Sequence, residues 1–224
     1  SEGLRAWRWG RTGFPIVDAG MRELRATGWM HQSVRMVVAS FLTEYLGEDW
    51  RHGLRVFHTE LVDADLAINS MMWQNAGRSG IDQWNFLLPP DTSKPARDPT
   101  GNYVRKWCPE LAKLPVQFVH CPWTASAAAL KEAGVQLGVT YPKRVVTDLR
   151  SARELTKRAV LAMRRAHLHF NDDGGYDQIV LPDGSKTRVF TKQEYRISSA
   201  DGELLPPPEK RPRAWGDKGK DKGG

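Results

Sequence analysis

The apolar residues of the first third of the chain recur at the spacing of an α-helix, and this pattern restricts the fold more than any other feature. It predicts a helix that begins at Pro15, where proline suits a first turn, and ends before Gly28. A broad apolar stripe predicts a buried helix over residues 30–46. A third helix is expected over 49–61, with Asp49 as its N-terminal cap, and a fourth over 63–73.

The rest of the chain continues this helical pattern and then changes character. Further helices are expected over residues 103–111, 125–133 and 151–170, and residues 86–100 are expected to form a surface loop. The turn sequence at 182–185 lies between two short apolar runs, which predicts a β-hairpin. From Pro206 onward, prolines followed by Lys, Gly and Asp predict a disordered tail. The predicted fold class is therefore all-α, with one hairpin and a loose end.

Composition excludes several classes of protein. The chain has 224 residues, 40% of them hydrophobic, and a net charge of +7, so wholesale disorder is excluded and a nucleic-acid partner is compatible. No apolar run approaches the roughly 18 residues of a membrane span, so no membrane partner is expected. Two cysteines, Cys108 and Cys121, cannot build a disulfide framework and are expected to be buried thiols in a reducing compartment. His167 and His169 lack the spacing of a helical metal pair, and no metal site is expected.

Two clusters of polar and aromatic residues carry the candidate chemistry. Trp29, Gln32 and Arg35 are three residues apart and are expected to share part of one helix face. Asp65, Asn69 and Trp73 are four apart, which predicts one stripe of the fourth helix, with Asp63 just before it. Carboxylates, an amide and indoles in an apolar setting need partners, and Arg35 is the expected partner of Asp63. Such a stripe suits a pocket for a flat polar ring, whereas a helix cap with an ordinary aromatic core is the structural alternative.

Four stretches of sequence together resemble one family. The segments GRTGFPIVDAGMRELRATGWMH, FLTEYLGEDWRHG, LVDADLAIN and DPTGNYVRKWCPELAKLP are similar to the C-terminal half of the flavin-binding domain of cryptochromes and photolyases. The resemblance implies a helical domain that holds FAD and is excited by blue light. It implies that residues 1–146 are the C-terminal portion of that domain, that 147–170 form an amphipathic helix, and that 171–224 form an extension with the hairpin and a basic tail. The antenna domain and the loop that binds the FAD phosphates are expected outside this chain, so no antenna chromophore is expected here.

The resemblance also assigns roles to individual residues. Arg35 matches a family position at the FAD site, paired with the acidic residue matched by Asp63, while Asp65 matches the acidic residue beside the flavin and its ribose. Asn69 matches the position that faces the flavin N5 atom, where photolyases have Asn and plant cryptochromes usually Asp. The implied cofactor-binding residues are Trp29, Gln32, Arg35, Asp63, Asp65 and Asn69.

An electron-transfer chain of tryptophans is implied as well. Trp73 matches its proximal member and Trp50 its middle member, so these residues, with Asn69, are the candidate catalytic residues. The distal member would lie before Ser1, and Trp7 and Trp9 are the candidates for a replacement.

Departures from the family pattern bear on function. Gln32 replaces an Asn of the photolyases that repair cyclobutane dimers, and Asn75 replaces a Trp that packs against the flipped-out lesion. Loss of that indole removes base stacking of about 1–3 kcal/mol. The (6-4) photolyases have His at the positions of Gln32 and Met36. These differences favour a cryptochrome-like receptor.

Three functions therefore stay open at the level of the sequence. The leading hypothesis is an FAD-based blue-light photoreceptor, with the region after Phe170 as a candidate contact for a signalling protein. The alternative is a DNA photolyase that repairs pyrimidine dimers, so whether the protein is an enzyme is undecided; a helical remnant that only binds partners is the third hypothesis. An intracellular location is expected, with the nucleus favoured over the chloroplast by the basic residues Lys210–Arg213, which a solvated tail explains equally well.

Overall fold

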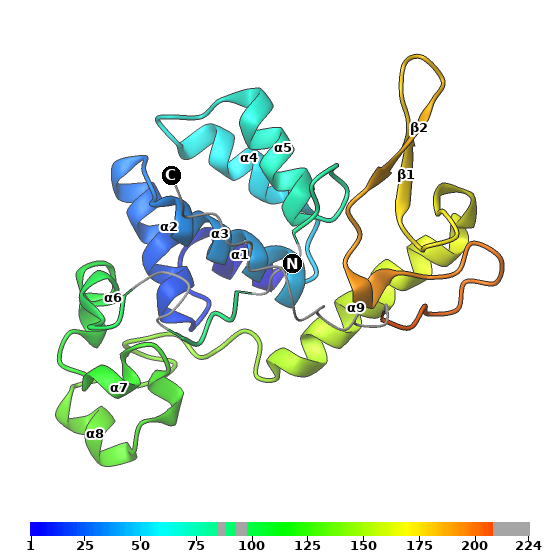
Figure 1. The fold of residues 1–224 in the computed structure, drawn as a ribbon. Coiled ribbons are helices and arrows are strands. Elements are labelled where there is room, and N and C mark those ends of the chain that lie inside the picture. The colour runs from blue at the N-terminus through cyan, green and yellow to red at the C-terminus, as the bar shows by residue number, and fades with distance from the viewer. Residues whose placement is uncertain (85–87, 93–97, 208–224) are drawn as a thin grey trace, which may run out of the picture.

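The computed structural model describes residues 1–84, 88–92 and 98–207 of the chain. They form a helical body, followed by a smaller extension that comprises residues 149–207 and contains one antiparallel hairpin (Figure 1). The predicted fold class is therefore confirmed. The predicted tail after Pro206 lies almost entirely outside the described residues. The α-helices are α1 Glu2–Arg8, α2 Pro15–Thr27, α3 Gln32–Ser40, α4 Trp50–Glu60, α5 Leu66–Ala76, α6 Asn102–Trp107, α7 Val116–Val119, α8 Ala127–Glu132 and α9 Leu149–Ala166. The strands are β1 Asp177–Val180 and β2 Lys186–Val189, and short 3₁₀ turns cover Pro109–Leu111, Pro122–Thr124, Leu168–Phe170 and Gln193–Tyr195.

Helix α2 forms the centre of the body and ends as its sequence predicts. Pro15 occupies the first turn, where its missing N–H costs no hydrogen bond. Gly28 ends the helix in the left-handed conformation with φ of 70°, and its N–H donates to the carbonyl of Leu24. A side chain at Gly28 would also overlap Val62, so this close approach fixes α2 against the chain that follows α4.

Two predicted helix starts are wrong because polar side chains cap the helices later. The helix predicted from residue 30 begins at Gln32, since the His31 side chain accepts a hydrogen bond from the Ser33 N–H. Trp29 therefore precedes α3 and shares no helix face with Arg35. The helix predicted from residue 63 begins at Leu66, since Asp65 is its cap and accepts from the Ile68 N–H at 2.7 Å. Asp65 thus lies at the end of the stripe and not on it.

Helix α3 continues into a π-helical turn, Phe41–Tyr45, which the sequence pattern does not predict. Such turns insert one extra residue per turn and often mark functional sites. Here the turn buries Glu44, whose side chain forms an ion pair with the buried Arg78. The backbone carbonyl of Glu44 accepts a hydrogen bond from the Thr156 hydroxyl of α9 at 3.0 Å. The π-turn is therefore where the helical body meets the extension.

The extension is packed and not loose. A small apolar cluster of Leu161, Tyr195 and Ile197 holds α9 against the following chain. The β1–β2 pair has the register Asp177–Val189 to Val180–Lys186, around the predicted turn, so the predicted hairpin is confirmed. Gln83, in the loop after α5, donates to Asp177 at 2.9 Å and so ties the hairpin to the helical body. Residues 171–205, which precede the predicted tail, are therefore part of the packed fold.

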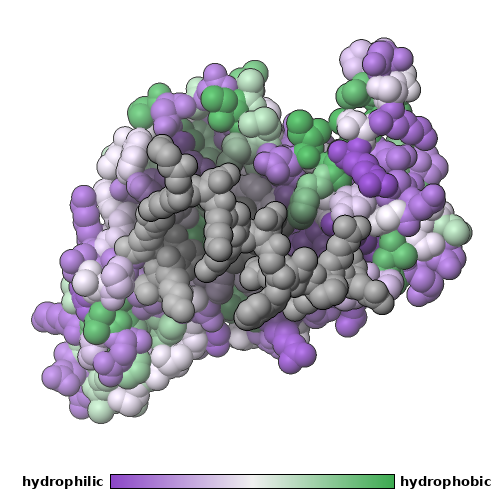
Figure 2. Space-filling view, in the orientation of Figure 1, coloured by the Kyte–Doolittle hydropathy of each residue, from purple (hydrophilic) through white to green (hydrophobic). Residues whose placement is uncertain are grey.

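Surface composition differs between elements. Helix α5 carries no charged residue and exposes Leu66, Ile68 and Met71, whereas α9 exposes Arg150, Arg158 and Arg165. Figure 2 shows hydrophobic side chains over the α4–α5 region and a largely hydrophilic extension.

None of the described helices combines the length and the apolarity needed to cross a bilayer. Both cysteines are free thiols; Cys108 is buried as predicted, whereas Cys121 is only partly buried.

Candidate cofactor-binding site

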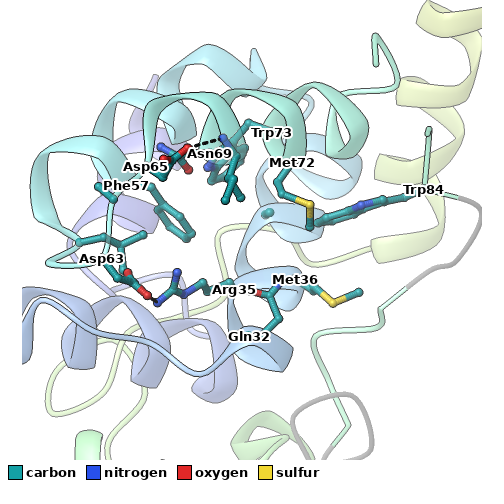
Figure 3. A pocket seen from close by; sticks show the side chains of 14 residues that line it. Gln32, Arg35, Met36, Phe57, Asp63, Asp65, Asn69, Met72, Trp73 and Trp84 are labelled. Atoms are coloured by element: carbon teal, nitrogen blue, oxygen red, sulfur yellow. Dashed lines mark hydrogen bonds and ion pairs between the residues drawn. The ribbon is translucent and has the colours of Figure 1, made fainter. Parts of the chain in front are cut away.

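A cavity of about 240 Å³ lies between α3 on one side and α4 and α5 on the other (Figure 3). Most of its wall is apolar or aromatic, and a few polar side chains converge on it, which is typical of small-molecule sites. Its lining residues are Gln32, Arg35, Met36, Ala39, Phe57, Leu61, Asp63, Ala64, Asp65, Ile68, Asn69, Met72, Trp73 and Trp84. The structure therefore brings together five of the six predicted cofactor-binding residues.

Arg35 and Asp63 form the ion pair that the sequence predicts. Arg35 Nη2 lies 3.0 Å and 2.8 Å from the two carboxylate oxygens of Asp63, and Arg35 Nε donates to the carbonyl of Met30 at 2.7 Å. The guanidinium is thus fixed from two sides while Asp63 remains about half exposed. This pair joins α3 to the α4–α5 connection and places a paired charge at the edge of the cavity.

Asn69 is the polar group that points from α5 into the cavity. It is buried, and its Nδ2 donates to the carbonyl of Leu54 in α4 at 3.3 Å. This hydrogen bond defines the orientation of the amide, which leaves Oδ1 without a partner among the described residues. A fixed acceptor in an apolar cavity suits the N–H edge of a flat ring.

Trp73 forms one wall of the cavity, one helical turn beyond Asn69. Its ring meets Phe57 edge to face, with ring centroids 5.0 Å apart. A Cβ at Gly53 would overlap the six-membered part of the Trp73 ring, so glycine at that position lets α4 and α5 approach closely. A Cβ at Gly77 would likewise overlap the Trp50 side chain, which packs beside the end of α5. Both predicted electron-transfer tryptophans thus depend on an opposing glycine.

The remaining predicted residues occupy different positions. Gln32 lines the cavity from the exposed first turn of α3, and Asp65 lines it as the cap of α5. Trp29 does not line it: its side chain is 44% exposed and its ring lies against His31. Trp84, which the sequence analysis did not single out, does line the cavity after the chain turns back from α5. Its signal in the sequence was a tryptophan soon after the glycine-rich turn.

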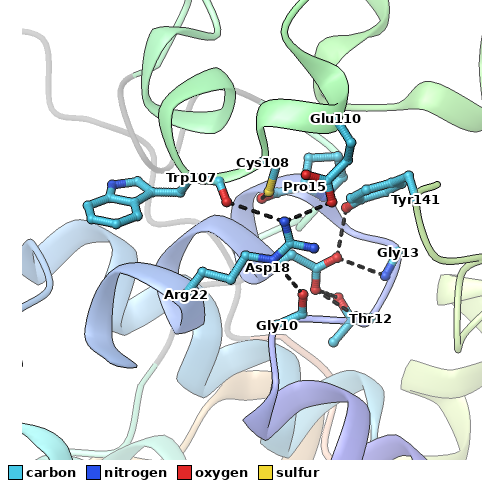
Figure 4. Close-up of polar contacts among 10 residues, drawn as sticks. All are labelled: Gly10, Thr12, Gly13, Pro15, Asp18, Arg22, Trp107, Cys108, Glu110 and Tyr141. Carbon is cyan, nitrogen blue, oxygen red and sulfur yellow. Dashed lines mark hydrogen bonds and ion pairs between the residues drawn. The ribbon is translucent and has the colours of Figure 1, made fainter. Parts of the chain in front are cut away.

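A second buried polar cluster lies away from the cavity, around Asp18 of α2 (Figure 4). Thr12 donates to Asp18 Oδ1 from both its N–H and its hydroxyl at 2.6 Å, while Gly13 N–H and the Tyr141 hydroxyl donate to Oδ2 at 3.0 and 2.7 Å. Burial nevertheless raises the pKa of Asp18 above its ordinary value. Every side of this carboxylate faces protein, so the cluster joins distant segments and leaves no room for a ligand.

The cavity defines the chain as a helical domain with an aromatic-walled site for one flat, polar ring system. Cavities that enclose drug-sized ligands measure roughly 300–1,000 Å³, so 240 Å³ suits the ring of a larger cofactor and not a whole dinucleotide. Arg35 is the only cation in the lining, and Asp63 already pairs with it, so this lining provides no site for a diphosphate. The residues present therefore fit the isoalloxazine end of FAD.

Comparison with known proteins identifies the family. The sequence profile described as the FAD binding domain of DNA photolyase matches residues 1–162. Cryptochrome-2 of Arabidopsis thaliana is 45% identical over 167 residues, which are 74% of this chain and 27% of the relative. The deoxyribodipyrimidine photo-lyase of Agrobacterium fabrum is 46% identical over 166 residues, 73% of this chain and 34% of the relative. The chain therefore belongs to the photolyase and cryptochrome family, and FAD is the cofactor of this domain.

Solved structures agree with this membership. A bacterial class III photolyase from Agrobacterium tumefaciens matches 73% of this chain and 34% of its own, with a TM-score of 0.69 and 45% identity. The Synechocystis sp. PCC6803 cryptochrome matches 70% of this chain and 33% of its own, with a TM-score of 0.66 and 40% identity. The chain thus spans about a third of the length of these relatives, and both cryptochromes and photolyases are among them.

Proposed function

We propose that this chain is part of a cryptochrome-type blue-light photoreceptor in which tryptophans reduce the photoexcited flavin. Bound FAD supplies the absorption of blue light and an acceptor for one electron. Trp73 is positioned to donate that electron because its ring forms a wall of the cavity, and Trp50, on the neighbouring helix, follows as the next donor. Asn69 would hold the ring edge through its free Oδ1, and as a neutral amide it supplies no acidic proton.

The observation that favours a receptor is the position of Asn75. This side chain is buried, and its Oδ1 accepts a hydrogen bond from the Asp82 N–H at 3.3 Å. Gly80 packs so closely that a Cβ there would overlap Asn75 Oδ1. Asn75 therefore supports the loop after α5, outside the cavity lining, and provides no aromatic surface there for an extruded base.

Replacement of Trp73 tests this proposal. In the FAD-loaded protein, Trp73→Phe should slow photoreduction by roughly a hundredfold or more, since it removes the first donor. Trp107→Phe is the matched control, because Trp107 lies in α6 and lines no part of the cavity, and its photoreduction should equal that of the wild type. Unchanged bleaching of the flavin absorption in Trp73→Phe would overturn the assignment.

Repair of DNA is a second candidate function, and Trp84 is the observation that favours it. Trp84 lines the cavity from the loop that Asn75 supports, so it offers an indole at the site despite the loss of the aromatic residue at 75. Asn69 is also the amide that photolyases have, and the photolyase relatives are named for this reaction. Light-dependent loss of thymine dimers from irradiated single-stranded DNA, abolished in Trp84→Ala, would establish repair. Absence of any light-dependent loss at saturating protein would exclude it.

A signalling partner, as a receptor requires, would bind through the extension. The residues of the extension beyond 162 lie outside the family match, and the hairpin region exposes Val180, Leu181 and Phe190. Removal of residues 182–185 from the hairpin turn should leave flavin photoreduction unchanged and abolish binding of that partner. The nuclear location expected from Lys210–Arg213 is a separate proposal, and fusion of residues 206–224 to a fluorescent reporter tests it.

A further inference from the structure

Trp7 is a buried tryptophan that the proposed electron-transfer route does not use. It lies in α1, and its side chain has no exposed surface. Its ring meets that of Trp73 edge to face, with centroids 6.2 Å apart and planes at 85°. Trp73 therefore has two tryptophans to consider as neighbours, Trp7 through this ring contact and Trp50 on the adjacent helix α4.

The surroundings of the Trp7 indole differ from those of Trp50 and Trp9. Its Nε1–H donates to the backbone carbonyl of Val38 at 2.9 Å. A carbonyl accepts this hydrogen bond but is too weak a base to take the proton from an oxidised indole. Trp50 is only half-buried, and Trp9 is 49% exposed beneath the Arg25 guanidinium, so water reaches both. Trp7 is thus a redox-active side chain in contact with the proximal donor, without an exit for its proton.

We propose that Trp7 is a dead-end branch of the tryptophan chain that returns the electron hole to Trp73. The inference rests on the proposed function, with the light-excited flavin as the oxidant. One electron passes from Trp73 to the flavin, which leaves a Trp73 radical cation. One electron then passes from Trp7 to Trp73, which restores neutral Trp73 and leaves the radical cation on Trp7. No bond forms or breaks and no proton moves in either step.

The branch has a different outcome from the route through Trp50. A radical on Trp50 can lose its indole proton to water and so persist. Among the described residues, only the Val38 carbonyl is within hydrogen-bond distance of Trp7 Nε1, so a radical on Trp7 keeps its proton. Back transfer of an electron from Trp73 then restores neutral Trp7. Trp7 would therefore hold the charge briefly and lower the yield of stable photoreduction.

Flash absorption of the FAD-loaded protein tests the branch most directly when Trp50 is removed. In Trp50→Phe, the transient tryptophan radical should persist through Trp7. In Trp50→Phe/Trp7→Phe, its lifetime should fall by roughly tenfold or more, because the hole stays on Trp73 beside the acceptor. Trp50→Phe/Trp107→Phe is the matched control and should keep the lifetime of Trp50→Phe, because Trp107 lies in α6 and lines no part of the cavity. With Trp50 intact, Trp7→Phe should raise the steady-state yield of photoreduction.

Equal lifetimes in Trp50→Phe and Trp50→Phe/Trp7→Phe would overturn the inference while leaving the proposed function intact. Persistence of the signal in Trp73→Phe would instead overturn the proposed function. A readout without flavin separates the redox role from packing. Near-ultraviolet circular dichroism should show a non-additive change for Trp7→Phe and Trp73→Phe, and an additive one for Trp107→Phe and Trp73→Phe. Additivity in both pairs would contradict the ring contact itself, and thermal unfolding of each variant checks that it is folded.

Discussion

The polar cluster around Asp18 and the polar groups of the cavity use the same kinds of side chain in opposite ways. Around Asp18, each carboxylate oxygen accepts two hydrogen bonds, and the donors come from segments as distant in sequence as Thr12 and Tyr141. In the cavity, Asn69 uses one end of its amide to hold α4 and leaves the other end free. A satisfied cluster stabilises the fold, whereas a partly satisfied one in an apolar cavity is a site for a ligand.

The largest expected effect concerns the Asp18 cluster, which is the closed side of this comparison because protein groups occupy both carboxylate oxygens. Asp18→Ala leaves the donors of Thr12, Gly13 and Tyr141 buried without an acceptor, so the free energy of unfolding should fall by about 3 kcal/mol or more. Urea denaturation measures the change. Asp183→Ala is the matched control, since Asp183 also accepts from a neighbouring N–H and hydroxyl but is exposed, and its cost should stay below about 1 kcal/mol. Equal losses in the two variants would contradict the structural role of the closed cluster.

A smaller effect, on ligand affinity and not on folding, is expected for Asn69 in the cavity, which is the open side of this comparison. Asn69→Leu keeps the size of the side chain and removes the free acceptor, so the dissociation constant of flavin should rise about tenfold. The free energy of unfolding of the flavin-free protein should change by less than about 1 kcal/mol, because only the 3.3 Å bond to Leu54 is lost. Fluorescence titration with FAD and urea denaturation provide the two measurements. A variant that is strongly destabilised but binds flavin normally would reverse the comparison.

The pH dependence of folding sharpens the closed side further. Burial raises the pKa of Asp18, so the folded protein holds this proton more tightly than the unfolded chain. The resulting stabilisation is complete below about pH 4, the ordinary range of an aspartate, and is lost as the pH rises through the folded pKa. Asp18→Asn cannot titrate. The stability advantage of the wild type over Asp18→Asn should therefore be greatest at acid pH and shrink toward neutrality; parallel curves would show that the pKa of Asp18 is not raised.

Sequence reasoning succeeded where structure depends on neighbouring residues. Pro15 and Gly28 mark the ends of α2, and Asp49 caps α4, because each acts on backbone within a few residues of itself. The pairing of Arg35 with Asp63 followed from their chemistry. Trp84 was missed because its place in the cavity depends on how the chain turns back after α5, which no periodic pattern encodes.

Long-range contacts account for the other differences. The packing of the extension depends on pairs such as Gln83 with Asp177, which are 94 residues apart and carry no joint signal in a single sequence. The contact of Trp7 with Trp73 has the same character, since α1 was not predicted and its position beside α5 arises only in the folded body. The roles assigned to the cavity residues remain predictions until flavin binding is measured.

The smallest expected effect concerns a charged cap on the helix that carries Trp50. Asp49 caps α4 by accepting from the Arg51 N–H at 2.9 Å, so Asp49→Ala should lower the free energy of unfolding by about 1 kcal/mol, whereas Asp49→Asn should retain most of the cap. The hydrogen bond from the Arg51 side chain lowers the pKa of Asp49 to about 2. Its stabilisation is therefore present above about pH 4 and is lost as the pH falls through 2, opposite in sign to that of Asp18. Chemical denaturation of Asp49→Ala and Asp49→Asn between pH 2 and 7 tests both statements, and a loss in Asp49→Ala that stays constant down to pH 2 would contradict the lowered pKa.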